Sequence, residues 1–324
     1  MKKPSSSKNS RKATLNKRLV KKISPLLLAA CATFFTNATV RADWIYEGGN
    51  NYRVNTNDPN PWTKRIGQGY NTPDDPVILF LTVDAGASVS TGNDTAITYK
   101  NNFNLTVNGT VQNASVNSQG GYAIYGAGGN TVEANNWNNI TVNAGGQILS
   151  NGTQAQSEAI NIMGFGNTVT NRGTIWAKNN AAIWFQDRVN GSGQDPQRNQ
   201  VENFGLVGRD DETRSVIGTS GGNGIIFKNY GTVKGGLSFA QGNDDLYFYA
   251  GSVVTGSIDG GGGQNNMFLD GGTNSDDTLT QTLKNFQTIT KTGEGKWTIS
   301  GSISSSQGRV PIFDMFGWSR ERWR

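Results

Sequence analysis

The densest cluster of charged side chains in the sequence is Arg209-Asp210-Asp211-Glu212-Thr213-Arg214. Carboxylates that lie close together can hold a calcium ion, and a neighbouring arginine can serve as the base of a polysaccharide lyase. The cluster lies in an irregular segment flanked by glycine, where solvated charges that pair with one another are the simpler interpretation. We therefore assign no catalytic residue to it and keep a carbohydrate-active enzyme as an alternative.

A second segment has the composition of a calcium-binding turn. Gly242-Asn243-Asp244-Asp245-Leu246-Tyr247 matches the second half of the nonapeptide found in calcium-bound β-rolls. The stretch Gly260–Phe268 has Asn265 where that pattern needs aspartate, and Asp276-Asp277 is out of register. Calcium takes oxygen ligands from adjacent turns, and one match does not make such an array. We favour ordinary turn chemistry, keep a calcium-stabilised β-roll as an alternative, and predict no metal or cofactor site.

Composition excludes several catalytic classes. The chain contains no histidine, so a Ser-His-Asp triad, a Cys-His pair and a histidine-based zinc site are all excluded. No phosphate-binding Walker loop occurs in the sequence either. Trp137, Trp176 and Trp184-Phe185 could stack on sugars, but packing explains them equally well. We therefore assign no binding residue.

The N-terminal segment has the order of a secretory signal peptide. Residues 1–42 hold ten of the 29 basic residues and none of the 24 acidic ones. An apolar stretch follows from Ile23 to Val40, and Val40-Arg41-Ala42 places small residues at the −3 and −1 positions before Asp43. We expect export by the Sec machinery with cleavage after Ala42. Leu28-Ala29-Ala30-Cys31 resembles a bacterial lipobox and offers lipidation at Cys31 as the alternative.

Removal of residues 1–42 changes the charge and the redox properties of the chain. It leaves 19 basic and 24 acidic residues, a net charge of −5 in place of +5. A nucleic-acid partner is therefore not expected. Cys31 is the single cysteine, so the mature chain has no disulfide and must be stabilised by its fold.

Residues 43–78 differ in composition from the rest of the mature chain. They are rich in asparagine, aspartate and aromatic residues and contain four of the eight prolines. Proline cannot donate a ladder hydrogen bond, so this segment is expected to form an N-terminal cap that covers the first strand edge. Repeats occupy residues 79–304. Residues 305–324 lose the repeat pattern and form an atypical C-terminal tail.

Short strands separated by Asn-x-Gly turns recur through the repeat region. Asn104-Leu105-Thr106-Val107-Asn108 recurs as Asn139-Ile140-Thr141-Val142-Asn143. Other repeated pieces are Asn130-Thr131-Val132, Asn167-Thr168-Val169 and Asn199-Gln200-Val201, and turn–strand units beginning at Asn108, Asn171, Asn203 and Asn229. A second strand type is expected at Ala96-Ile97, Ala123-Ile124, Ala159-Ile160, Ala182-Ile183 and Gly224-Ile225.

A repeat of roughly 20–40 residues is typical of a solenoid. Coils stacked at the spacing between paired strands would bury a continuous apolar core, and equivalent asparagines could form ladders at the corners. Residues 190–196 and 210–224 are expected to be loops that absorb the variable spacing. The sequence therefore predicts an all-β parallel β-helix with an N-terminal cap. A β-sandwich is the alternative, but its turns would not repeat the same Asn-x-Gly signature.

One segment resembles a known family. Residues 285–301, which read Asn-Phe-Gln-Thr-Ile-Thr-Lys-Thr-Gly-Glu-Gly-Lys-Trp-Thr-Ile-Ser-Gly, are similar to the passenger-associated repeat of bacterial autotransporters. The spacing of Phe286, Ile289, Trp297 and Ile299 predicts that they pack inward on two strands, with a tight turn at residues 292–295. Together with the upstream repeats, the resemblance covers residues 79–304.

The resemblance implies a right-handed, pectin lyase-like β-helix that serves as a structural or adhesive passenger without catalysis of its own. Its expected partners are host or bacterial surface glycans or proteins. Members of the family carry a C-terminal translocator barrel, and no such barrel occurs in this sequence. We therefore interpret the chain as a passenger fragment. It would reach the cell surface or the medium if a translocator is available, and otherwise the periplasm.

Overall fold

A computed structural model of the chain describes residues 45–57, 59–67, 77–113, 121–126, 137–153, 156–186, 197–273, 275–306 and 311–315. The chain divides into two compact units, residues 1–42 and 43–324, and every described residue belongs to the second. The predicted signal peptide, Cys31 and Asn130-Thr131-Val132 lie outside the described residues. Within them, all regular structure is β-strand, and no helix is long and apolar enough to cross a membrane.

Twelve of the described strands form the first sheet. All its neighbouring strands pair in parallel except β1 and β2, which are antiparallel. In spatial order the strands are β1 (Ile45–Gly48), β2 (Asn51–Val54), β3 (Phe80–Val83), β6 (Asn104–Val107), β9 (Asn139–Val142), β12 (Thr168–Asn171), β15 (Asn199–Asn203), β18 (Ile225–Asn229), β21 (Asp245–Tyr249), β24 (Asn266–Gly271), β27 (Thr288–Gly293) and β30 (Ile312–Met315).

The remaining described strands form three further parallel sheets. The second sheet contains β4 (Ser88–Thr91), β7 (Thr110–Asn113), β10 (Gln147–Ser150), β13 (Thr174–Ala177), β16 (Leu206–Arg209), β19 (Thr232–Lys234) and β22 (Val253–Val254). A separate pair contains β25 (Asp276–Leu279) and β28 (Lys296–Ile299). The third sheet contains β5 (Ile97–Tyr99), β8 (Ile124–Gly126), β11 (Ile160–Met163), β14 (Ile183–Gln186), β17 (Ser215–Thr219), β20 (Gly236–Ser238), β23 (Ile258–Asp259), β26 (Leu283–Lys284) and β29 (Ile303–Ser304).

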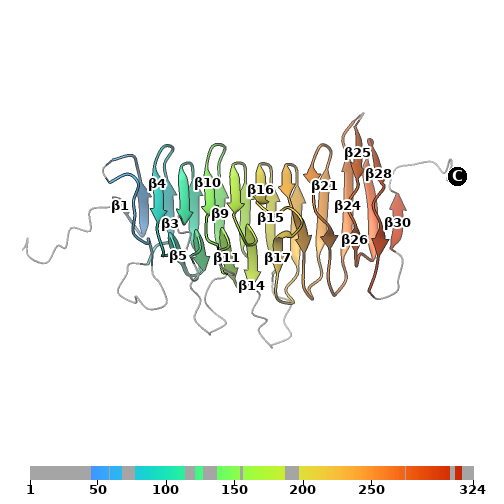
Figure 1. The fold of residues 1–324 in the computed structure, drawn as a ribbon, viewed down its shortest axis with the longest axis horizontal. Helices are drawn as coiled ribbons and strands as arrows, with labels where there is room; N and C mark the ends of the chain where they lie inside the picture. Colours follow the sequence, from blue (N-terminus) through green and yellow to red (C-terminus); the bar gives the residue numbers. More distant parts are fainter. Residues whose placement is uncertain are drawn as a thin grey trace, which may run out of the picture. The chain divides into compact units, whose positions relative to one another are not determined.

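Three consecutive strands make one coil of the fold. The chain passes from the first sheet to the second and then the third, and the next coil repeats the path one strand further along (Figure 1). Equivalent residues pair one to one, so that β12 lies beside β15 with Asn171 opposite Asn203. This arrangement confirms the predicted parallel β-helix.

Alternation along each strand builds the core. In the first sheet, Leu105, Ile140, Val169, Val201 and Phe227 are paired with one another in successive coils and are at most 1% exposed. Burying an aliphatic or aromatic side chain contributes about 1.5–3 kcal/mol. Because such columns recur along all the sheets, the apolar core runs continuously through the stack.

The repeats detected in the sequence are structural equivalents in most cases. Asn104 to Val107 pairs with Asn139 to Val142 without a shift. The strands that follow the Asn-x-Gly turns also stack in register, with Thr174 opposite Leu206 and Leu206 opposite Thr232.

One predicted equivalence is wrong. Ile183 pairs with Ile217 of β17 and not with Ile225, which begins β18 of the first sheet. The prediction that residues 210–224 form only a loop is therefore also wrong, because this segment contains β17. Val216-Ile217 lacks the small residue that precedes isoleucine in the other members, so the sequence pattern pointed to the wrong isoleucine.

The expected asparagine ladder is present at one corner. The side-chain amide of Asn171 donates to Asn203 Oδ1 at 2.9 Å, and that of Asn203 donates to Asn229 Oδ1 at 2.9 Å. Each oxygen also accepts the N–H of the glycine two residues later in its own turn. The repeated Asn-x-Gly signature therefore serves both the turn within a coil and the bond between coils.

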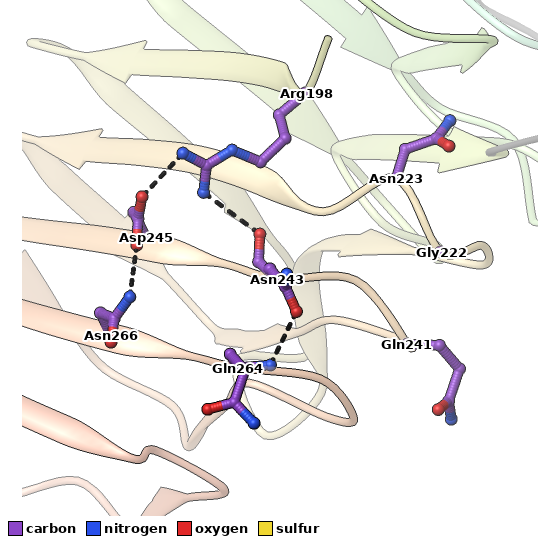
Figure 2. A pocket seen from close by; sticks show the side chains of 8 residues that line it. All are labelled: Arg198, Gly222, Asn223, Gln241, Asn243, Asp245, Gln264 and Asn266. Atoms are coloured by element: carbon purple, nitrogen blue, oxygen red, sulfur yellow. Dashed lines mark hydrogen bonds and ion pairs between the residues drawn. The ribbon is translucent and has the colours of Figure 1, made fainter. Parts of the chain in front are cut away.

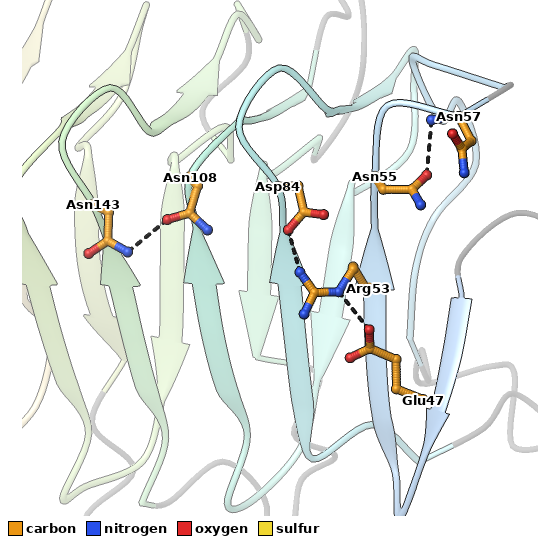
Figure 3. Close-up of polar contacts among 7 residues, drawn as sticks. All are labelled: Glu47, Arg53, Asn55, Asn57, Asp84, Asn108 and Asn143. Carbon is orange, nitrogen blue, oxygen red and sulfur yellow. Dashed lines mark hydrogen bonds and ion pairs between the residues drawn. The ribbon is translucent and has the colours of Figure 1, made fainter.

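In the first coils, the corner position one residue further along the chain carries polar, half-buried side chains, at Asp84, Asn108 and Asn143. Arg53 donates to Glu47 Oε1 at 2.6 Å and to Asp84 Oδ1 at 2.7 Å, which links β1, β2 and the turn after β3 (Figure 3). Further along, Asn143 donates to Asn108 Oδ1 at 2.8 Å. Within residues 43–78, β1 lies antiparallel on β2, while Trp62 and Ile66 bridge to Val89 and Ile97 of the following coil.

The segment that resembles the autotransporter repeat forms a corner between two sheets. Phe286 and Ile289 are each 2% exposed in the core, and Trp297 and Ile299 are partly buried against it. The turn itself is only residues 294–295, between β27 and β28. The predicted inward packing of these four side chains is confirmed.

The ladder predicts a stability difference between two Asn→Ala substitutions. Asn203 is fully buried, and Asn203→Ala leaves the Gly205 N–H without its partner and removes one hydrogen bond from each of the two neighbouring amides. We expect a loss of about 2–3 kcal/mol in the free energy of unfolding. Asn139→Ala removes an exposed ladder bond to Asn104 and should change it by less than about 0.5 kcal/mol. Equal shifts in urea unfolding would contradict the buried-ladder explanation.

Candidate functional site

The charged cluster at residues 209–214 serves the fold. Arg209 is 4% exposed, and its guanidinium donates to the Ser215 carbonyl at 2.9 Å and to the Asn179 carbonyl. Its burial lowers the pKa of the guanidinium. Arg209 therefore holds a turn together.

The carboxylates of this cluster point to different partners. Asp210 Oδ1 accepts from Trp176 Nε1 at 2.7 Å, and Asp211 Oδ1 accepts from the Thr213 backbone N–H at 3.1 Å and from its hydroxyl. These bonds from Thr213 lower the pKa of Asp211. Glu212 accepts from the Thr255 hydroxyl at 2.9 Å. Among the described residues, no group of three or more acidic residues is placed to hold a metal ion.

The two aspartates of the calcium-like segment lie on opposite faces of the coil. Asp244 is fully buried and accepts the Ile225 N–H at 2.8 Å. Asp245 faces outward, pairs with Arg198 at 2.7 Å and accepts from Asn266 Nδ2 at 2.8 Å. Successive residues of a strand alternate between faces, so these carboxylates do not converge on one point.

The tryptophans named from the sequence pack against glycines. A Cβ at Gly208 would lie 2.3 Å from the Trp176 ring, and one at Gly218 would lie 2.6 Å from the Trp184 ring. Trp137 covers Gly166 in the same way and remains 44% exposed. Phe185 is fully buried in the core. Packing therefore accounts for these aromatic residues.

A polar pocket with a volume of about 370 Å³ lies where the chain returns to the first sheet in four successive coils. This volume is within the range of about 300–1,000 Å³ that is usual for small-molecule sites. Its walls are formed almost entirely by amide side chains and one ion pair, contributed by Arg198, Gly222, Asn223, Gln241, Asn243, Asp245, Gln264 and Asn266.

The Arg198 side chain extends past the following coil and contacts the coil after it. Strand register places Arg198, Gly224 and Asn243 at equivalent positions of three successive coils. Gly224 has φ +72° and no side chain, and a Cβ there would lie 2.2 Å from the Asn243 carbonyl oxygen. The guanidinium passes this glycine and donates to the Asn243 carbonyl at 3.2 Å while it pairs with Asp245 (Figure 2).

Hydrogen bonds fix one side of the pocket. Asp245 links Arg198 to Asn266, and Asn266 Oδ1 in turn accepts from the Thr288 hydroxyl at 2.6 Å. In Figure 2 this group lies on one side, with Gln241 and Asn223 on the other. Asn243 Oδ1 accepts the Gln264 backbone N–H at 2.8 Å. The arrangement holds the only charged pair of the described lining in a fixed geometry.

The other side of the pocket offers amide groups. Gln241 and Gln264 are exposed, and no hydrogen bond from either side-chain amide is found in the described part of the chain. Asn223 is 4% exposed, and neither its Nδ2 nor its Oδ1 has a hydrogen-bond partner. Such a site can bind a polar ligand through groups that both donate and accept. The one carboxylate of this lining, Asp245, is paired with Arg198.

Comparisons of the chain with protein-family models, with curated proteins and with solved structures give no match. The family resemblance of residues 285–301 therefore remains an expectation from the sequence.

Sequence reasoning found Asp245 as a candidate but missed Arg198, Gln241 and Gln264. These residues are separated by up to 66 positions and belong to turns of different length, so no local motif contains them. The structure brings them together because the coils stack in register.

Sequence reasoning also missed a buried acid, Glu158, which lies outside this pocket. It is the single acidic residue between Glu133 and Asp187, is 6% exposed, and accepts from Asn180 Nδ2 at 3.0 Å. Burial raises the pKa of its carboxyl to about 7. The signal in the sequence that could have identified Glu158 is its position as an isolated acidic residue directly before the predicted strand at Ala159-Ile160.

The raised pKa of Glu158 predicts how stability depends on pH. The folded state keeps the proton up to about pH 7, whereas the unfolded chain releases it near its ordinary pKa of 4.5. Stability therefore falls as pH rises through this interval. Glu158→Gln should remove this decrease and be more stable than wild type at pH 8 by on the order of 3 kcal/mol, with no difference below pH 4.

The exposed Glu294 supplies the control, because Glu294→Gln should leave the pH profile of the melting temperature unchanged. Parallel pH profiles for Glu158→Gln and the wild type would show that Glu158 does not carry this dependence.

Proposed function

We propose that the chain is an exported passenger of the autotransporter type, with a structural or adhesive role and no catalysis of its own. The observation that carries the proposal is the pattern of residues 285–301, which places Phe286 and Ile289 in the core and continues the stack with β28. The pattern and the coil architecture support the same class.

The contacts of the described charged cluster at residues 209–214 support a non-catalytic role. Arg209 donates to two carbonyls, and the neighbouring carboxylates each bond a different side chain or backbone group. What the described residues offer to other molecules is the outer surface of the coils and the amide-lined pocket.

A route through a narrow translocation pore also fits the covalent chemistry. Cys31 is the single cysteine and precedes the predicted cleavage site. Once residues 1–42 are removed, no disulfide can form within the chain. The passenger would then acquire its stability by stacking coils after export.

Export is tested with the full chain in a Gram-negative host. We expect a product that begins at Asp43 outside the cytoplasm, and we expect Ala42→Asp to block processing because the −1 position requires a small residue. Cys31→Ala should have no effect. N-terminal sequencing of fractionated cells gives the readout. An intact chain beginning at Met1 in the cytoplasm would refute the proposal, and loss of processing in Cys31→Ala would indicate lipidation.

The non-catalytic role is tested with polygalacturonate, the substrate class of β-helix lyases. We expect no rise in the absorbance of unsaturated products with calcium present, because Arg209 is only 4% exposed and its guanidinium is bonded to two carbonyls. Turnover by the purified wild type that is lost in Arg214→Ala, a substitution of an exposed residue, would establish the enzymatic alternative.

A further inference from the structure

We infer that the pocket beside Arg198 binds a neutral carbohydrate. The inference concerns the pocket and the side chains next to it. It goes beyond the proposed export class and holds or fails independently of the export route.

The charges at the pocket favour an uncharged ligand. Arg198 and Asp245 form a 2.7 Å ion pair that compensates both charges. Further along the same sheet, Lys228 and Glu202 are likewise paired at 2.9 Å. The other residues of the lining are amides and a glycine. An anionic ligand would meet Asp245 without an unpaired cation, and a cationic ligand would have to compete with Arg198.

The hydrogen-bonding groups match hydroxyls. A sugar hydroxyl both donates and accepts, as a carboxamide does through its NH₂ and its oxygen. Gln241 and Gln264 are exposed side chains of successive coils on the pocket wall. No hydrogen bond from either amide is found in the described part of the chain, so both amides are available to a ligand.

Asn223 adds an independent indication. Its side chain is more than nine-tenths buried in the pocket wall, and both polar atoms lack a partner. A buried amide left unsatisfied costs roughly 1–3 kcal/mol. A ligand hydroxyl that hydrogen-bonds to this amide would recover that cost.

An apolar ridge continues from the pocket. Tyr247 follows Asp245 by two residues and Phe268 follows Asn266 by two, so both rings share the outer face with the pocket at a distance of about 7 Å along the strand. The rings stack with centroids 4.5 Å apart. A sugar has hydroxyls on its rim and C–H groups on its faces, and this site offers amides beside aromatic edges.

A peptide ligand is disfavoured by the sheet itself. Extended peptides usually bind by pairing with an open strand edge. At the pocket, β21 is paired with β18 on one side and β24 on the other, so no edge is available. The binding groups are side chains, and their alternating donors and acceptors suit hydroxyls better than a strand.

The test measures binding of purified full-length chain to cellohexaose, mannohexaose and xylohexaose, with hexagalacturonate as the acidic comparison, by titration calorimetry. We expect at least one neutral oligosaccharide to bind, and the double variant Gln241→Ala/Gln264→Ala to weaken that binding by about tenfold or more. Gln147→Ala, an exposed glutamine on β10 far from the pocket in the chain, should leave it unchanged. Asn223→Ala should reduce binding without lowering the melting temperature.

Three outcomes would overturn the inference. They are no binding of any of the three neutral oligosaccharides, preferential binding of hexagalacturonate, and equal affinity of the double variant and the wild type. Because the measurement uses purified protein, failure of export leaves its result unaffected, and failure of binding leaves the export test unaffected.

Discussion

The one-to-one parallel register between successive coils is the constraint on which the rest of the structure depends. Each strand of the first sheet between β3 and β24 is paired on both sides. A side chain therefore meets its equivalents in the coils before and after it, and each inward position must be suitable for stacking. The central column from Leu105 to Phe227 satisfies this with apolar groups. The corner column from Asn171 to Asn229 satisfies it with amides that bond their own kind.

A second buried column shows what happens where the stacking pattern changes. The N–H of Asn138 donates to Asn167 Oδ1, and that of Asn167 donates to Asn199 Oδ1, each across one coil. The next coil has Ile225 at this position, which cannot continue the ladder, and Asp244 then accepts the Ile225 N–H. Gly224 lies directly before this interruption and leaves the space through which Arg198 reaches Asp245. The pocket thus lies at the coil where the repeat is broken.

Local turn chemistry made the fold predictable from the sequence. Asn171, Asn203 and Asn229 each precede a glycine by two positions, and this signature specifies a turn and a ladder together. The alternation of apolar and polar residues then fixed which face is inward. The same reasoning failed at Ile217, because its coil lacks an alanine before the isoleucine. Coil length between repeats varies, and local patterns cannot determine which of two similar strands is the equivalent one.

The candidate site could not be predicted because its residues share no local pattern. Gln241, Gln264 and Asn223 are common turn residues in this chain and differ from others only in what the stacked coils place beside them. In contrast, the charged clusters that attracted attention in the sequence bond within the fold. The charged side chains at this corner have a structural use, because they join irregular turns that the asparagine ladder does not connect.

The same register that builds the core also preorganises the pocket. Arg198 is held by the Asn243 carbonyl and by Asp245, and Asp245 is held by Asn266. These contacts join three coils whose strands are already paired, so a ligand would not need to order this wall. A binding site with fixed polar groups loses less conformational entropy on association. A solenoid can therefore acquire a specific site by changing one coil while the neighbouring coils keep their geometry, and Gly224 with Ile225 marks such a change in this chain.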